Sequence, residues 1–187
     1  MSKFTLLTLI LVFSVASVFA FDPTKQKDSH LAVFITNPLS GASKIGGLVE
    51  MRLRLSSFCI GATDYIGGYT GIQYKFEYHK YLYTERRNEY FWYLKAFGGD
   101  VTYEADKLML VGDGTNKIIG PLNYYGGGAG FGRRYNWKHI CLMVNAGLKY
   151  AALPENLSDE NRESFRVFYA TGPGSIIDLN FRLGYQF

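Results

Sequence analysis

Residues 177–187, with the sequence IDLNFRLGYQF, decide the fold. The odd positions of this stretch hold only apolar or aromatic side chains, and the even positions hold polar side chains and one glycine. Side chains alternate between the two faces of a β-strand, whereas a helix repeats every 3.6 residues, so the stretch predicts a strand with one apolar face. The residues of that face are Ile177, Leu179, Phe181, Leu183, Tyr185 and Phe187.

The same period of two recurs in the residues before this strand. It is clear in four earlier segments and weaker in two others, and a short apolar segment that ends before Asn37-Pro38 also reads as a strand. We therefore predict an all-β fold with eight strands. Their approximate positions are 30–36, 44–55, 57–66, 70–83, 89–104, 121–135, 137–150 and 175–187.

Two groups of glycines lead to local predictions. Gly98-Gly99 is expected to form a β-bulge that shifts the alternation before Val101. Alternate glycines within residues 126–132 are expected to face inward, where they let the wall bend or leave room for a large neighbour.

The composition also favours strands joined by turns. The chain has 187 residues, of which 48% are hydrophobic and 19% charged, with 21 Gly, 15 Tyr and 14 Phe. Glycine and aromatic residues are poor helix formers, so a helical bundle is disfavoured. A net charge of +4 gives no reason to expect a nucleic-acid partner.

The first 20 residues are expected to form a secretory signal peptide. Lys3 precedes an apolar run at 6–15, and Val18-Phe19-Ala20 resembles a cleavage site, which we place after Ala20. No later apolar run is long enough for a membrane-spanning helix. The expected organisation is therefore a cleaved leader at 1–20, an N-terminal periplasmic segment at 21–29 and one β-barrel domain at 30–187.

The connections between the predicted strands differ in length. Tight turns are expected at 55–57, 84–88 and 135–137, and longer loops at 37–43, 105–120 and 151–174. In outer-membrane barrels short turns lie on the periplasmic side and long loops on the outer side. A strand at 164–170 in place of the first strand would break this asymmetry, so we disfavour it. An extra hairpin within 106–120 stays open.

Two patterns favour a membrane barrel over a soluble lipocalin-like barrel or sandwich. Aromatic residues collect near strand ends, with Tyr69, Tyr103 and Tyr150 at the expected outer side. Charges of both signs lie on the faces opposite the apolar ones, where a narrow lumen could neutralise them. The predicted lumen cluster consists of Glu50, Arg52, Arg54, Lys75, Glu77, His79, Lys95, His139 and Arg182.

These features resemble the small, eight-stranded outer-membrane β-barrel proteins of Gram-negative bacteria. The last strand is similar to the C-terminal signal that the outer-membrane assembly machinery reads, with Phe181, Leu183, Tyr185 and Phe187 at alternate positions. The resemblance implies an eight-stranded antiparallel up-and-down transmembrane barrel in the outer membrane. Its expected partners are outer-membrane lipid, lipopolysaccharide, the assembly machinery and an unidentified extracellular partner.

The residues favour a structural or surface-interaction role over catalysis. No phosphate loop, zinc spacing or nucleophile elbow is present, so we expect no cofactor, metal or catalytic residue. Some barrels that resemble this one deacylate or acylate lipid A, and this activity is one alternative. A narrow pore or small-ligand transporter is the other. Cys59 and Cys141 are expected to remain unpaired, because a disulfide would have to cross the lumen.

Overall fold

The computed structural model describes residues 29–37, 44–66, 69–84, 88–104, 118–155, 158 and 175–187. No helix in these ranges is long and apolar enough to cross a membrane. The strands are β1 (Ser29–Thr36), β2 (Lys44–Leu53), β3 (Ser56–Tyr65), β4 (Tyr69–Thr70), β5 (Ile72–Thr84), β6 (Asn88–Glu104), β7 (Ile118–Trp137), β8 (Ile140–Ala152) and β9 (Ile177–Gln186).

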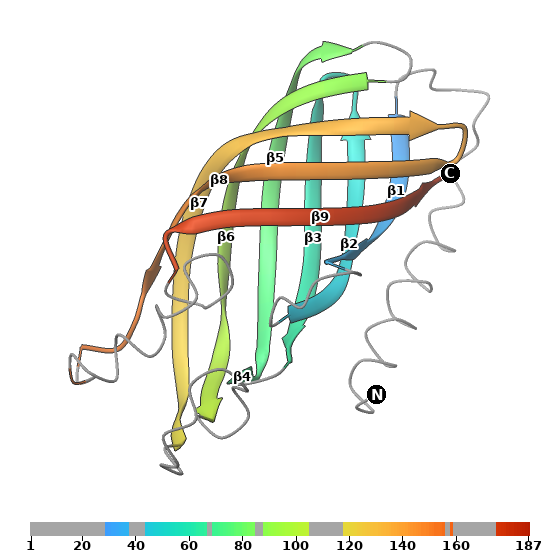
Figure 1. Ribbon diagram of the computed structural model, residues 1–187. Coiled ribbons are helices and arrows are strands. Elements are labelled where there is room, and N and C mark those ends of the chain that lie inside the picture. Colours follow the sequence, from blue (N-terminus) through green and yellow to red (C-terminus); the bar gives the residue numbers. More distant parts are fainter. Residues whose placement is uncertain are drawn as a thin grey trace.

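The strands close into one antiparallel barrel (Figure 1). β9 pairs with both β8 and β1, and β6 pairs with both β5 and β7, so no wall strand is left with an open edge. The short β4 precedes β5 and pairs with β6 as well. Gly71, which separates β4 from β5, has a φ of 126° that suits glycine. β4 and β5 therefore form one wall strand, and the barrel has eight.

The predicted fold and all eight predicted strands are confirmed, with two local corrections. The last tight turn consists of Lys138 and His139 and not of residues 135–137, because β7 continues to Trp137. The predicted bulge at Gly98-Gly99 is wrong, because both glycines pair regularly with β5 and β7. The irregularity in the pairing of β6 with β7 lies between Val101 and Tyr103. The leader at 1–20, the rival strand at 164–170 and residues 106–117 of the possible hairpin lie outside the described residues.

The connections divide the barrel into two ends. At the end that we call the turn end, the strands are joined by residues 54–55, 85–87 and 138–139. Ser29 and Phe187 lie at the same end, where the Phe187 amide donates to the Leu31 carbonyl at 3.0 Å. The opposite end, called the loop end, carries the connections 37–43, 105–117 and 153–176.

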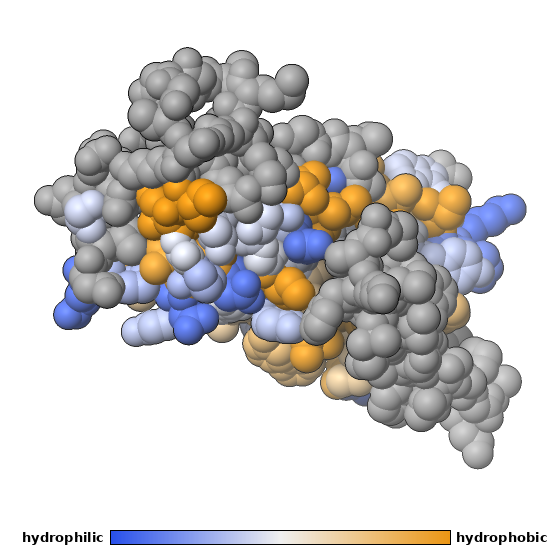
Figure 2. Space-filling model, turned by 90° about the horizontal axis from the view of Figure 1, so that it is seen from below, coloured by the Kyte–Doolittle hydropathy of each residue, from blue (hydrophilic) through white to orange (hydrophobic). Residues whose placement is uncertain are grey.

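The two faces of the wall differ in chemistry. Large hydrophobic side chains on every long strand point outward and are exposed, and examples are Ile60, Phe76, Leu94, Leu148 and Leu179. Figure 2 shows hydrophobic residues on the outer surface next to hydrophilic ones. The interior is filled by charged, polar and aromatic side chains, most of them buried. A water-soluble barrel has the opposite arrangement, with its apolar side chains inside.

Aromatic side chains of β6 pack over inward-facing glycines of β7. The ring of Tyr93 covers Gly130 so closely that a Cβ there would lie 2.8 Å from Tyr93 Cε1. A Cβ on Gly126 would lie 2.7 Å from the Phe97 ring. The absence of side chains on β7 therefore makes room for the large residues of β6, as the alternating glycines predicted.

A cluster of buried residues, called the tyrosine cluster, lies at the loop end of the interior. Tyr65 and Tyr124 join their hydroxyls at 2.6 Å, and the rings of Tyr69 and Tyr103 lie 5.5 Å apart. Tyr69 and Tyr103 therefore face inward, which corrects the prediction that they belong to an outer aromatic belt. Tyr150 is exposed on the outside, as predicted. The other members of the cluster are Phe97, Val101 and Ile119.

Candidate functional site

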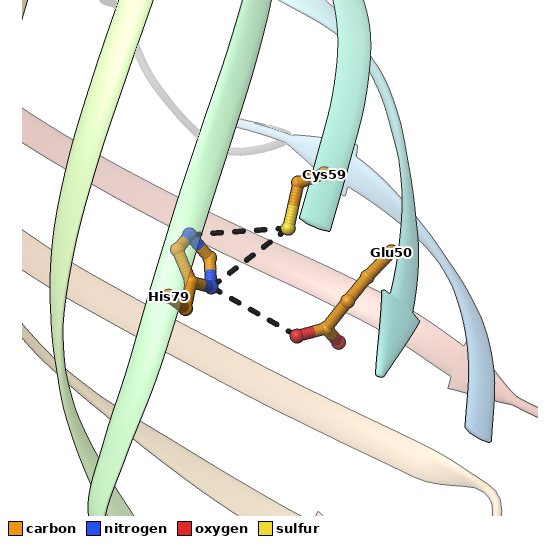
Figure 3. Close-up of side chains that lie close together, drawn as sticks. All are labelled: Glu50, Cys59 and His79. Atoms are coloured by element: carbon orange, nitrogen blue, oxygen red, sulfur yellow. Dashed lines mark hydrogen bonds and ion pairs between the residues drawn. The ribbon is translucent and has the colours of Figure 1, made fainter. Parts of the chain in front are cut away.

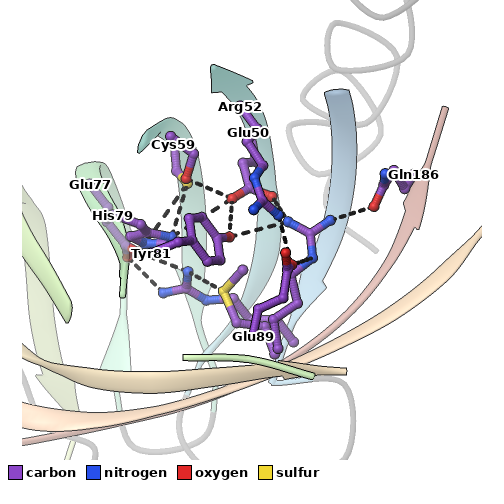
Figure 4. A network of polar contacts seen from close by, with 12 residues as sticks. Glu50, Arg52, Cys59, Glu77, His79, Tyr81, Glu89 and Gln186 are labelled. Carbon is purple, nitrogen blue, oxygen red and sulfur yellow. Dashed lines mark hydrogen bonds and ion pairs between the residues drawn. The ribbon is translucent and has the colours of Figure 1, made fainter. Parts of the chain in front are cut away.

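Ionic side chains in the turn half of the barrel form one connected network (Figure 4). The network takes residues from β2, β3, β5, β6, β7 and β9. Antiparallel pairing places their inward positions at similar depth, and alternation turns each side chain toward the axis. The barrel wall therefore brings together residues that lie far apart in the sequence.

Glu50 on β2 lies at the centre of this network. Its Oε1 accepts hydrogen bonds from Ser57 Oγ at 2.7 Å and from the Tyr81 hydroxyl at 2.8 Å. Its Oε2 forms an ion pair with Arg134 on β7. Arg134 also donates through Nη2 to Gln186 Oε1 at 2.8 Å, which ties β7 to the last strand. Both oxygens of this buried carboxylate are thus satisfied by the protein itself.

Glu89 and Arg52 form a second ion pair close to the turn end. Arg52 Nη1 donates to Glu89 Oε2 at 2.7 Å, and Asn136 Nδ2 donates to the same oxygen at 3.0 Å. The Arg52 guanidinium also lies 3.9 Å from the centre of the Tyr81 ring. A cation over an aromatic face is stabilised by the ring quadrupole. Tyr81 also donates to Glu50, so it links the Glu89–Arg52 pair to the Glu50–Arg134 pair.

Glu77 and Arg182 form the third ion pair. Arg182 donates through Nη1 to Glu77 Oε2 at 2.8 Å and through Nη2 to Glu77 Oε1 at 2.7 Å. His79 Nε2 lies 2.9 Å from the same Oε2, and the His79 ring stacks on Phe91 with centroids 4.6 Å apart. Each of the three buried carboxylates in this half therefore has its own guanidinium partner.

Glu50, Cys59 and His79 are close enough for their ligand atoms to be considered as a metal site (Figure 3). Cys59 Sγ lies 3.8 Å from His79 Nδ1, and Glu50 Oε1 lies 3.8 Å from the same nitrogen. However, the Glu50 oxygens already accept three hydrogen bonds, and the network holds three buried guanidiniums. A cation would have to displace these contacts and approach like charges, so the donor set fits a hydrogen-bonded core better than a metal centre.

A nucleophilic role for Cys59 does not fit this geometry either. Cys59 is 1% exposed and His79 is fully buried, so neither side chain is open to a substrate in the structure. Cys141 is buried as well, and the two cysteines are not joined by a disulfide. The prediction of two unpaired thiols is confirmed.

Asp178 on β9 is the centre of a separate group nearer the middle of the barrel. Lys95 Nζ lies 2.5 Å from Asp178 Oδ1, and the Tyr93 hydroxyl donates to Oδ2 at 2.7 Å. Asn180 Nδ2 donates to Oδ1 at 3.0 Å. Lys75 on β5 is also buried.

The structure places seven of the nine residues of the predicted lumen cluster in the interior. They are Glu50, Arg52, Lys75, Glu77, His79, Lys95 and Arg182. Arg54 is an exposed turn residue with a φ of 55°, because β2 ends at Leu53 and not at residue 55. His139 is exposed in the turn before β8, where its ring stacks on Tyr185 at 5.5 Å. These two residues were wrongly assigned to the lumen.

Arg134 and Glu89 belong to the network but were not predicted. The glycine-rich β7 corresponds to one of the two segments in which the alternation is weaker. Gly130 and Gly132 face inward, so the same parity would have placed Arg134 inward. Glu89 shares the parity of Phe91 and Tyr93, which also point into the barrel.

The residues of the predicted C-terminal motif lie on the outer face of β9 or at its end. Leu183, Tyr185 and Phe187 are exposed, and Phe181 is partly buried. The Tyr185 and Phe187 rings lie 5.1 Å apart at the turn end. These residues take no part in the interior network.

Comparisons with known proteins identify the fold. No family model matches the chain, and its sequence matches no curated protein. Among solved structures, it is similar to the N-terminal beta-barrel domain of Pseudomonas aeruginosa OprF, with a TM-score of 0.52 and 12% sequence identity. The match covers 87% of this chain and 98% of that domain. At this level of identity the similarity concerns the β-barrel architecture alone.

Proposed function

We propose that this chain is an outer-membrane β-barrel with a structural or surface-interaction role, whose lumen is closed by its own side chains. The observation that carries the proposal is that apolar side chains cover the outside of the wall, while charged side chains are buried inside. Leu94, Leu148 and Leu179 are half-exposed or more on the outside, while Glu50, Glu77 and Arg182 are buried inside. An apolar outer face of this kind is stable in contact with lipid.

Aromatic residues at the turn end support the same proposal. Tyr135 and Trp137 stack with centroids 6.0 Å apart on the outer face, and Tyr185 lies on the outer face of β9. Arg133 lies over the Tyr90 ring at 4.9 Å and over the Tyr135 ring at 4.5 Å. Aromatic and arginine side chains are favoured where hydrocarbon meets the polar headgroups. The turn end would then be the periplasmic side.

A filled interior disfavours a wide pore. The three carboxylate–guanidinium pairs block the turn half, and the tyrosine cluster occupies the loop half. Interaction with the outside would then fall to the long connections at 105–117 and 153–176. Outer-membrane lipid and lipopolysaccharide would surround the wall, and the assembly machinery would read the C-terminal strand.

The location of the histidines gives no support to the lipid A enzyme. Such an enzyme needs a base beside its nucleophile near the outer leaflet. His79 is buried in the turn half, and His30 and His139 lie at the turn end itself. All three would therefore lie on the side opposite the outer leaflet.

Membrane fractionation combined with heat-modifiable gel mobility tests the proposal. The protein should fractionate with outer membranes, and unboiled samples should migrate differently from boiled ones because a folded barrel resists the detergent. Recovery in the soluble periplasmic fraction, with one mobility before and after boiling, would contradict it. In planar bilayers the purified barrel should give no large conductance steps, and large steps would refute the closed lumen.

A further inference from the structure

The outer face of β7 carries an arginine beside apolar and aromatic side chains. Arg133 points outward, because the next residue, Arg134, is buried in the lumen. Its partner on β6 is the exposed Tyr90, and its partner on β8 is the exposed Val144. Charge on a lipid-facing wall costs free energy unless it reaches a polar partner. The outward residues of β7 between Arg133 and the loop end include Tyr125, Gly127, Ala129 and Phe131.

The rings of two tyrosines hold the Arg133 side chain. Its Cζ lies 4.9 Å from the centre of the Tyr90 ring and 4.5 Å from the centre of the Tyr135 ring. Trp137 extends this group, with its ring nearly parallel to that of Tyr135. Each tyrosine ring attracts the positive charge through its quadrupole. A ring has no net negative charge, so these contacts hold the guanidinium in place without neutralising it.

The terminal nitrogens of Arg133 have no partner within the protein. Among the residues that the structure describes, none forms an ion pair or a side-chain hydrogen bond with this guanidinium. Its Nε is enclosed and is therefore not open to a ligand. Nη1 and Nη2 are not enclosed in this way, since the side chain is partly exposed. Two charged donor groups are thus available at the outer surface.

The position of Arg133 along β7 places it at the edge of the apolar band. It lies eight residues from Tyr125, which is 72% exposed on the same outer face. At about 3.4 Å per residue and a strand tilt of about 40°, these two residues are about 20 Å apart along the membrane normal. The apolar band of a membrane barrel is about 25 Å tall. With Tyr125 near one boundary, Arg133 therefore lies near the other, where the lipid headgroups begin.

The partner that suits Arg133 at this depth is a phosphate group. A guanidinium presents its N–H groups as a planar fork, which matches two oxygens of one phosphate, so a single side chain supplies converging donors. We propose that Arg133, held by Tyr90 and Tyr135, binds the phosphate of a phospholipid in the periplasmic leaflet. Nη1 and Nη2 donate to two phosphate oxygens, and the acyl chains lie along Phe131 and Val144. This inference rests on the membrane location proposed above.

Quenching of tryptophan fluorescence by brominated lipids tests the site. The two tryptophans of the chain report on this region, because Trp92 pairs with Phe131 and Trp137 stacks on Tyr135. The full barrel is inserted into vesicles of digalactosyldiacylglycerol, which has no phosphate. A small fraction of phosphatidylethanolamine, brominated near its headgroup, is the probe. It carries a phosphate but no net charge, so general attraction between charges does not enrich it.

The measured quantity is the affinity for this probe relative to brominated digalactosyldiacylglycerol. In the wild type the ratio should be about fivefold, which corresponds to about 1 kcal/mol. Arg133→Gln should lower the ratio to near one. Lys138→Gln is the matched control, because Lys138 is an exposed turn cation at the same end, and it should keep the wild-type ratio. A wild-type ratio near one, or an unchanged ratio in Arg133→Gln, would overturn the proposal. Equal loss in Lys138→Gln would refute a site specific to Arg133.

Arg133→Lys keeps the test decisive if Arg133→Gln does not insert. Lysine retains the charge but not the planar fork, so the ratio should fall to about half or less. A wild-type ratio in Arg133→Lys would contradict the two-point contact. Insertion of each variant is measured separately by heat-modifiable mobility. A wild-type barrel that does not insert would contradict the membrane location itself, whereas insertion with a ratio near one would contradict the lipid site alone.

Discussion

Arg182 on β9 and Glu77 on β5 form a two-point ion pair across the lumen, with N–O distances of 2.8 and 2.7 Å. β5 and β9 are not neighbours in the wall. The pair therefore joins opposite sides of the barrel directly, and it does so with the parallel geometry in which guanidinium–carboxylate contacts are strongest.

Removing one member of this pair should destabilise the barrel severely. Arg182→Met leaves the Glu77 carboxylate buried without its guanidinium partner, and breaking a buried pair in this way costs about 3–5 kcal/mol. The double variant R182M/E77L should recover much of the loss, because neither charge remains. Urea titrations followed by gel mobility measure the stability of the single and the double variant. Equal stability of the single variant and the wild type would show that the pair does not hold the barrel together.

The inward glycines of β7 should tolerate no side chain. Gly130→Ala would place a Cβ against the Ala146 carbonyl oxygen, 2.6 Å from Gly147 Cα and 2.8 Å from the Tyr93 ring, so we expect a loss of about 1–3 kcal/mol or more. Gly47→Ala is the matched control, since its nearest neighbour would lie 3.9 Å away. The midpoint of urea unfolding should fall for the first and stay near the wild-type value for the second. A midpoint that falls equally in both would mean that the loss reflects glycine content and not the close contacts of Gly130 with β8 and Tyr93.

The inward or outward direction of the wall residues could be predicted from sequence, because side chains alternate between the two faces of each strand. Phe91 and Tyr93 face inward while Tyr90 and Trp92 face outward, as simple alternation required. The wrongly placed side chains lie where a strand ends, whereas the wrongly predicted bulge at Gly98-Gly99 lies within β6. Arg54 would face the lumen only if β2 continued two residues further, and it lies in a turn instead.

The partners within the interior could not be predicted in the same way. Parity shows that Glu50 and Arg134 both point inward, but 84 residues separate them in the sequence. Their contact depends on the stagger of all the strands between them, which pairing registers determine and composition does not.

The last strand should control assembly through its outward aromatic residues. We expect Phe187→Asp to abolish membrane assembly while synthesis continues, because the C-terminal residue would no longer match the expected assembly signal. Ile176→Asp is a suitable control, since Ile176 is also exposed but precedes β9. Pulse labelling and heat-modifiable mobility measure synthesis and folding separately. Normal folding of Phe187→Asp in cells would contradict the role assigned to the C-terminal residues.

A charge on the outer wall should distinguish lipid from water as the surrounding solvent. Leu94 is 50% exposed near the middle of the wall, and Ile118 is 70% exposed at the loop end of β7. In a bilayer, Leu94→Arg should cost about 2–4 kcal/mol and Ile118→Arg about 0–1 kcal/mol, because the penalty for a cation falls toward the interface. In a water-soluble barrel both exposed substitutions would be nearly neutral. Folding into lipid vesicles, measured by urea titration, gives both values. Equal and small effects at the two positions would show that hydrocarbon does not surround this wall.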